Sequence, residues 1–166
     1  MRYKLGKIFI NNNINTKSFE VIEYNPSIDY YTYIKSYRDE GYDQVIITSE
    51  LMIDTLKVYF YDKKCTITHV ELLEHDTQME NEIEEILNQL RIDRGYFNLL
   101  LEKLKCLIEK NSIDIRKIEL QWREDGFTTA LFMQVNGLLG ITDEKYDSEK
   151  DKVLDIIKSK FIKAIV

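Results

Sequence analysis

The clearest pattern of hydrophobic and polar positions lies between Lys117 and Asn136. Two runs, 118–122 and 127–133, alternate apolar and polar side chains on either side of Asp125-Gly126. Asp-Gly favours the two-residue type I′ turn, because both of its central residues need positive φ. Closing a ladder over that turn gives three cross-strand pairs on one face: Trp122 with Thr129, Leu120 with Leu131, and Ile118 with Met133. Turn and alternation select the same register, so this segment is predicted to be a β-hairpin with one apolar face.

Shorter patterns upstream predict further strands and one helix. Residues 4–10 and 18–24 are predicted to be strands. A helix is expected to begin at Asn25-Pro26-Ser27, capped by Asn25 or by Ser27, and to end just before Gly41. Residues 44–48 are predicted to form a short buried strand. Residues 56–61 and 65–72 are predicted to form a second hairpin.

The segment 77–110 is predicted to be helical. Thr77 and Glu80 have the spacing of a capping box, which indicates a helix that starts at Thr77. Apolar residues then recur at helical spacing, and two interpretations stay open. We favour one continuous helix, because the apolar phase continues past Gly95. The alternative is a helical hairpin with a break at residues 93–95. A continuous helix would be about 51 Å long, longer than a compact domain of this size is wide.

The remaining patterns complete an α+β fold. Asn136-Gly137 predicts a turn before a strand at 138–141, and Ser148 with Asp151 predicts the start of a last helix. That helix is expected to face inward with Val153, Leu154, Ile157 and Phe161. We expect a single domain spanning 1–166, with an antiparallel or mixed β-sheet built around the 117–136 hairpin and packed by amphipathic helices. Strict βαβα alternation is missing, which argues against a doubly wound nucleotide-binding fold.

Composition and charge narrow the class of protein. The chain has 166 residues and a formal net charge of −6, which argues against nucleic-acid binding, since phosphate contacts need cations. Residues 1–7 are too polar for a signal peptide, and no apolar run is long enough to span a membrane. Cys65 and Cys106 match no metal or redox spacing, which indicates reduced thiols. We therefore expect a cytoplasmic protein.

Two groups of side chains are candidate partner-binding surfaces. Tyrosine is common at protein interfaces, and a dense acidic patch steers a basic partner. The tyrosines are Tyr30, Tyr33 and Tyr37, and the acidic residues are Glu80, Glu82, Glu84 and Glu85. The alternative for the tyrosines is a place at the core edge. For the glutamates it is a solvated helix start favoured by the helix dipole.

His69 and His75 lie in the only stretch where thiol, imidazole and carboxylate groups gather. Their spacing matches no recognised zinc pattern, so a structural role is expected for both. No catalytic, cofactor-binding or metal-binding residue is predicted from the sequence.

The wide apolar stripe of 77–110 predicts self-association as a homodimer. A stripe that wide can serve two neighbours at once, the sheet of its own chain and a helix of a second copy. The residues expected at the dimer contact are Arg94, Phe97, Leu101 and Leu104.

The leading functional hypothesis is a non-enzymatic protein-binding module, such as an inhibitor, an immunity-type protein or a mobile-element accessory protein. Its partner would be a protein, basic if the acidic residues bind it. One alternative is a small enzyme or ligand-binding domain that uses His69 or His75 with nearby carboxylates. Another is a structural assembly subunit that associates through 77–110.

Overall fold

The structure is a computed structural model that describes residues 2–13 and 18–165, with side chains described as far as Lys160. Over these residues the chain forms five α-helices and seven strands, and the strand pairs within each unit are antiparallel. The α+β class is therefore confirmed. The chain divides into two compact units, which are described separately: unit 1 is 1–47 with 136–166, and unit 2 is 48–135. The expectation of one domain over 1–166 stays a prediction.

Unit 1 is built on strand β1 (Tyr3–Asn11). Strand β2 (Ser18–Glu23) pairs with residues 6–11 of β1. Strand β7 (Leu138–Thr142) pairs with residues 3–7 of β1, and β3 (Tyr42–Gln44) pairs with residues 9–11. The predicted strands at 4–10, 18–24 and 138–141 are thus confirmed to within a residue or so at each end.

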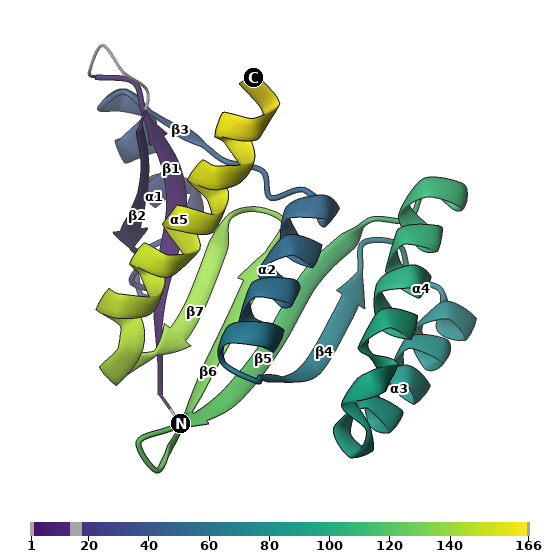
Figure 1. Ribbon diagram of the computed structural model, residues 1–166. Helices are drawn as coiled ribbons and strands as arrows, with labels where there is room; N and C mark the ends of the chain where they lie inside the picture. Colours follow the sequence, from purple (N-terminus) through teal and green to yellow (C-terminus); the bar gives the residue numbers. More distant parts are fainter. Residues whose placement is uncertain (1, 14–17, 166) are drawn as a thin grey trace. The chain divides into compact units, whose positions relative to one another are not determined.

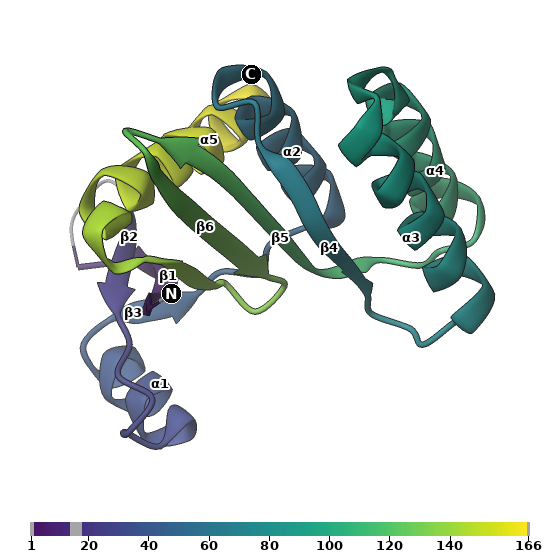
Figure 2. The same cartoon turned by 90° about the horizontal axis from the view of Figure 1, so that it is seen from below.

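Two helices cover unit 1. Helix α1 (Tyr30–Asp39) lies on one face of β1 and β2, and helix α5 (Tyr146–Ile165) lies on the other (Figures 1 and 2). A short 3₁₀ turn, Asp143–Lys145, leads into α5. Val153 and Ile157 of α5 are fully buried, as the sequence predicted. Phe161, which was predicted to face inward with them, lies outside the described side chains.

The first helix begins later than the sequence indicated. The Asp29 carboxylate accepts a hydrogen bond from the Thr32 amide at 3.0 Å and caps α1. Asn25 instead accepts from the Ser27 amide at 3.0 Å, a local turn that competes with helix formation. The predicted caps Asn25 and Ser27 are therefore wrong. Gly41 has φ of +93° just past the helix, as expected.

Two other predicted boundaries in unit 1 are wrong. Strand β3 ends at Gln44, so residues 45–48 are not a strand, although Val45 and Ile47 are buried as predicted. Helix α5 begins at Tyr146, before the predicted cap Ser148, because the preceding 3₁₀ turn already has helical geometry. The Ser148 hydroxyl donates back to the carbonyl of Lys145 at 3.2 Å.

Unit 2 contains the hairpin that the sequence predicted. Strand β5 (Ile115–Glu124) lies between β4 (Thr66–Leu72) and β6 (Phe127–Gln134). Asp125 and Gly126 have φ of +53° and +80°, as a type I′ turn requires. The three pairs predicted for the apolar face are all present: Trp122 with Thr129, Leu120 with Leu131, and Ile118 with Met133.

The segment predicted as a strand at 56–61 is instead part of helix α2 (Ser49–Asp62). The Thr48 hydroxyl accepts from the Leu51 amide at 3.2 Å and caps this helix. Met52, Leu56 and Tyr59 are fully buried at helical spacing. The helix is apolar around most of its circumference, so the helical period of apolar residues does not stand out in the sequence.

Helices α3 (Thr77–Ile92) and α4 (Phe97–Lys110) form a hairpin beside β4 (Figure 1). The predicted start at Thr77 is confirmed. The cap, however, is Asp76, whose carboxylate accepts from the Met79 amide at 3.1 Å.

The continuous helix favoured from the sequence is wrong, and the helical hairpin is the observed structure. Asp93 leaves helical geometry with φ of −134° and ψ of 111°. Its carboxylate then accepts from the Gly95 amide at 2.8 Å and starts the 3₁₀ turn Arg94–Tyr96. The apolar phase continues past this break, because both helices pack inside unit 2.

Arg94 joins the helical hairpin to the end of α2. Its guanidinium donates to the carbonyls of Phe60 at 2.9 Å and Cys65 at 3.3 Å. It also lies 3.9 Å from the centre of the Phe60 ring. The last carbonyls of a helix lack intrahelical partners and favour cations, so Arg94 stabilises the end of α2.

We expect Arg94→Met to lower the free energy of unfolding by about 1–2 kcal/mol, because carbonyls at the end of α2 lose a charged donor. Arg91→Met is the matched control, since Arg91 is exposed and, among the described residues, donates to the Asn88 side chain at 2.9 Å. Urea denaturation of both variants measures the difference. Equal stabilities would contradict the role given to Arg94.

Candidate functional site

The tyrosines singled out from the sequence gather around Phe9 in unit 1. The Phe9 ring lies 5.9 Å from Tyr33, 5.3 Å from Tyr37 and 6.1 Å from Tyr42, measured between ring centres. Tyr30 belongs to the same cluster and is half-buried. The predicted group Tyr30, Tyr33 and Tyr37 is therefore a contiguous aromatic cluster, with Tyr33 buried at its centre.

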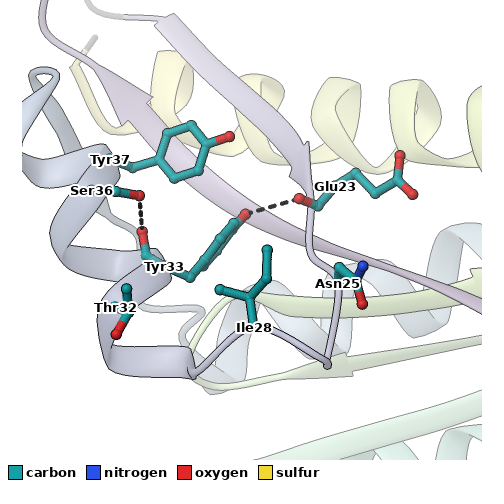
Figure 3. A pocket seen from close by; sticks show the side chains of 7 residues that line it. All are labelled: Glu23, Asn25, Ile28, Thr32, Tyr33, Ser36 and Tyr37. Carbon is teal, nitrogen blue, oxygen red and sulfur yellow. Dashed lines mark hydrogen bonds between the residues drawn. The ribbon is translucent and has the colours of Figure 1, made fainter.

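A pocket of about 410 Å³ opens beside this cluster, and we call it the α1 pocket (Figure 3). Its lining residues come from the end of β2, the following loop and α1: Glu23, Asn25, Ile28, Thr32, Tyr33, Ser36 and Tyr37.

Hydrogen bonds fix the floor of the α1 pocket. The Tyr33 hydroxyl reaches the backbone of β2, 3.1 Å from the carbonyl oxygen of Ile22 and 3.3 Å from that of Glu23. The Ser36 hydroxyl donates to the Tyr33 carbonyl at 2.8 Å. Burial raises the pKa of Tyr33, so its hydroxyl stays neutral. The floor is thus a fixed, uncharged aromatic surface.

Large apolar side chains are exposed around the α1 pocket. Ile28, which lines it, is 46% exposed, and Tyr31, which directly precedes the lining residue Thr32 in the chain, is 80% exposed. A partly open pocket with aromatic walls and exposed apolar neighbours can accept an apolar side chain from another molecule.

Lys7 is the functional candidate that the sequence analysis missed. Its side chain is fully buried, on the strand beside Phe9. The ammonium donates to the backbone carbonyl of Asn136 and lies 5.4 Å from the centre of the Tyr30 ring and 5.9 Å from that of Phe9. Asn136 also donates through its side chain to the Tyr30 hydroxyl at 3.5 Å.

Burial lowers the pKa of Lys7 from 10.5 to about 8, because the desolvated ammonium is disfavoured. Buried cations are normally paired with carboxylates, whereas the Lys7 ammonium contacts a backbone carbonyl and two aromatic rings. One signal was present in the sequence: Lys7 falls on the same strand face as Leu5 and Phe9.

The acidic residues singled out from the sequence do not form a purely acidic surface. Glu82 pairs with Lys103 of α4, and the hydrogen bond from Lys103 lowers the pKa of that carboxyl. Glu80 lies 3.0 Å from His75, and Glu84 lies 3.6 Å from His69.

Glu85 is exposed on α3, as a solvated helix face requires. The structure therefore brings cations or imidazoles to three of the four glutamates named from the sequence.

The histidines and cysteines are not brought together. Neither His69 nor His75 lines the α1 pocket, and His75 is almost wholly exposed. Cys65 is buried, which raises its thiol pKa to about 12, whereas Cys106 is exposed on α4. Among the described residues, no group of three or more His, Cys, Asp or Glu side chains could hold a metal ion.

The residues expected at a dimer contact lie inside unit 2. Phe97 stacks on Phe60 with ring centres 3.8 Å apart, and Leu101 and Leu104 are buried. Arg94 makes the contacts with α2 described above. The stripe that suggested a second copy is thus used within the chain.

Comparisons with protein-family models, with curated proteins and with solved structures each found no match. Within the described part of the chain, no helix combines the length and the apolar character needed to cross a membrane. The site must therefore be interpreted from its own geometry.

Proposed function

We propose that this chain is a protein-binding module that holds its partner through the α1 pocket. The observation that carries the proposal is an open pocket lined by Tyr33, Tyr37 and the partly exposed Ile28. The exposed Tyr31 directly precedes the lining residue Thr32 on the same helix. Tyrosine rings supply a large contact area at a low cost in side-chain entropy, which suits them to bind a partner. A role as an inhibitor, an immunity-type protein or a mobile-element accessory protein belongs to this proposal.

The tyrosines are a better partner surface than the acidic residues. Glu82 already has a cationic neighbour, Lys103, that reduces the negative field of α3, and Glu80 already contacts His75. Exposed ion pairs of this kind contribute little free energy. The α1 pocket, by contrast, offers apolar surface, and covering it with a partner would be favourable because it removes that surface from water.

The proposal places the module in the cytoplasm, where the free thiols of Cys65 and Cys106 would stay reduced. Homodimer formation stays a prediction, and Phe97, Leu101 and Leu104, which were expected at the dimer contact, are buried in the single chain. We therefore assign the α1 pocket to a different protein.

We expect Tyr31→Ala to weaken partner binding by about 2 kcal/mol, or roughly thirtyfold, as for an interface hot spot. Tyr61→Ala is the matched control, because Tyr61 is a 64% exposed tyrosine on a helix of unit 2. Each variant would carry an affinity tag in the native host, and the recovered partner would be quantified by mass spectrometry. Equal recovery with both variants would overturn the proposal.

A further inference from the structure

Strand β2 presents one open edge. It pairs with β1 from Gly6 opposite Glu23 to Asn11 opposite Ser18, and among the described residues β1 is the only strand it pairs with. The Tyr24 amide donates to the Leu5 carbonyl at 2.8 Å, which fixes the alternation of the ladder.

Because hydrogen-bonded and non-hydrogen-bonded positions alternate in an antiparallel pair, Glu20 and Ile22 direct their backbone groups to β1. Val21 therefore directs its N–H and C=O away from β1, toward the open edge. Such an edge is a template for another strand.

A groove of about 370 Å³ follows this edge, and we call it the β2 groove. Its lining combines four consecutive residues of β2 with one residue of β3 and three of α5: Phe19, Glu20, Val21, Ile22, Tyr42, Lys150, Asp151 and Leu154. Helix α5 lies over one face of β2 (Figure 2). A hollow lined by four consecutive residues of an edge strand leaves room for an added chain.

The two faces of the β2 groove differ in chemistry. On the α5 face, Val21 stands opposite Ile8 of β1, and α5 adds the apolar Leu154. Helix α5 also contributes Lys150 and Asp151, whose opposite formal charges cancel. On the α1 face, Glu20 stands opposite Phe9, and its carboxylate accepts a long hydrogen bond of 3.4 Å from Asn11. Glu20 is a half-buried carboxylate with no ion pair within the described residues, so it offers a negative charge to a partner.

We propose that an extended segment of the partner protein adds to the open edge of β2 as a further strand, with cationic and apolar side chains in alternation. The cations face Glu20, and the apolar side chains cover Val21 and Leu154. Successive side chains of a strand point to opposite faces, so one segment meets both requirements. This inference rests on the proposed function and supplies its binding mode.

The direction of β2 connects the two sites. Glu23, at the end of β2, contributes to the wall of the α1 pocket, and Asn25 follows it there. A strand that continues past Glu23 therefore brings its next side chains to that pocket. A second copy of β2 is a poorer occupant, because residues 18–23 contain two glutamates and neither Lys nor Arg.

The test uses two short synthetic peptides, one that alternates lysine with valine and one that alternates glutamate with valine. Backbone amide shifts of the full chain are followed by NMR during titration. We expect the lysine peptide to shift the amides of β2 and to bind about tenfold more tightly than the glutamate peptide. Equal binding of the two peptides, or shifts confined to unit 2, would overturn the inference.

Val21→Pro tests the backbone contribution. It removes the outward N–H but no bond to β1, since proline is tolerated where the amide faces away from the ladder. We expect about a tenfold loss of lysine-peptide binding, whereas Val21→Thr keeps the N–H and the binding. Hydrogen exchange of the β1 amides checks that the fold is intact. If Val21→Pro does not fold, Glu20→Lys replaces it and must reverse the preference between the peptides; an unchanged preference overturns the inference.

The same variants separate the two proposals. Loss of the native partner with Tyr31→Ala but not with Val21→Pro would leave the α1 pocket as the binding site and reject strand addition. Lysine-peptide binding at β2, with full recovery of the native partner by Tyr31→Ala, would reject the α1 pocket and keep the edge as a strand-binding site.

Discussion

Replacing Trp122 by alanine is expected to lower the free energy of unfolding by about 3–5 kcal/mol. The indole is only 4% exposed and lies 5.1 Å from the Tyr59 ring of α2, between ring centres. Its N–H donates to the Glu124 carboxylate at 3.2 Å. Removing it leaves a cavity between the hairpin and α2. The expected loss of free energy is a large fraction of the stability of an ordinary domain.

Phe127→Ala is the control for this prediction, because Phe127 belongs to the same hairpin and is 74% exposed. We expect its stability to stay within about 0.5 kcal/mol of the unchanged protein. Urea denaturation followed by circular dichroism measures both variants. A Trp122→Ala protein as stable as Phe127→Ala would mean that the apolar face of the hairpin is not covered by α2.

Stability is expected to rise by about 2–3 kcal/mol between pH 8 and pH 10, because of Lys7. Its pKa falls from 10.5 to about 8 on folding. Below pH 8 the amine is charged in both states, and folding must bury the charge. Between pH 8 and 10.5 the unfolded chain binds the extra proton, so raising the pH favours the folded state. Above about pH 10 the rise ends, because burial raises the pKa values of Tyr33 and Tyr146 and unfolding then releases protons.

Lys7→Met tests this assignment, since methionine has a similar volume and no charge. We expect a variant at least as stable as the unchanged protein at pH 7, and a flat profile from pH 8 to 10. Lys35→Met is the control, because Lys35 is exposed on α1 and its removal leaves the rise in place. Parallel profiles for the unchanged protein and Lys7→Met would show that another group causes the rise.

The hairpin was predictable because two independent signals agreed. Asp125-Gly126 fixed the turn, and the alternation on each side fixed the register. The end of α1 at Gly41 was predictable for a similar reason, since few residues other than glycine adopt a φ of +93° easily.

Helix α2 and the break at Asp93 were not predictable from periodicity. Residues 49–62 are apolar on most sides, so a helix and a buried strand have nearly the same pattern there. The break depends on the Asp93 carboxylate and on carbonyls of α2 that attract Arg94. Such contacts arise only when distant segments meet.

The candidate site was half predictable. The density of tyrosines indicated Tyr33 and Tyr37, but the α1 pocket also needs the loop after β2, whose turn at Asn25 competed with the predicted helix start. Lys7 was missed because a lysine in a strand is normally taken to face solvent. The apolar neighbours on its face, Leu5 and Phe9, were the available signal.

The order of the two units along the chain has a consequence for synthesis on the ribosome. Unit 2 is one uninterrupted segment, 48–135, whereas unit 1 is made of two segments that flank it. Strand β1 pairs with β7, from Tyr3 opposite Thr142 to Lys7 opposite Leu138. Strand β1 can pair with β2 and β3 early, but its pairing with β7 must wait until unit 2 has been synthesised, and unit 2 can fold in the meantime. The Asn136 carbonyl, which accepts the hydrogen bond of the buried Lys7 ammonium, is likewise made only after unit 2, so Lys7 lacks this acceptor until then.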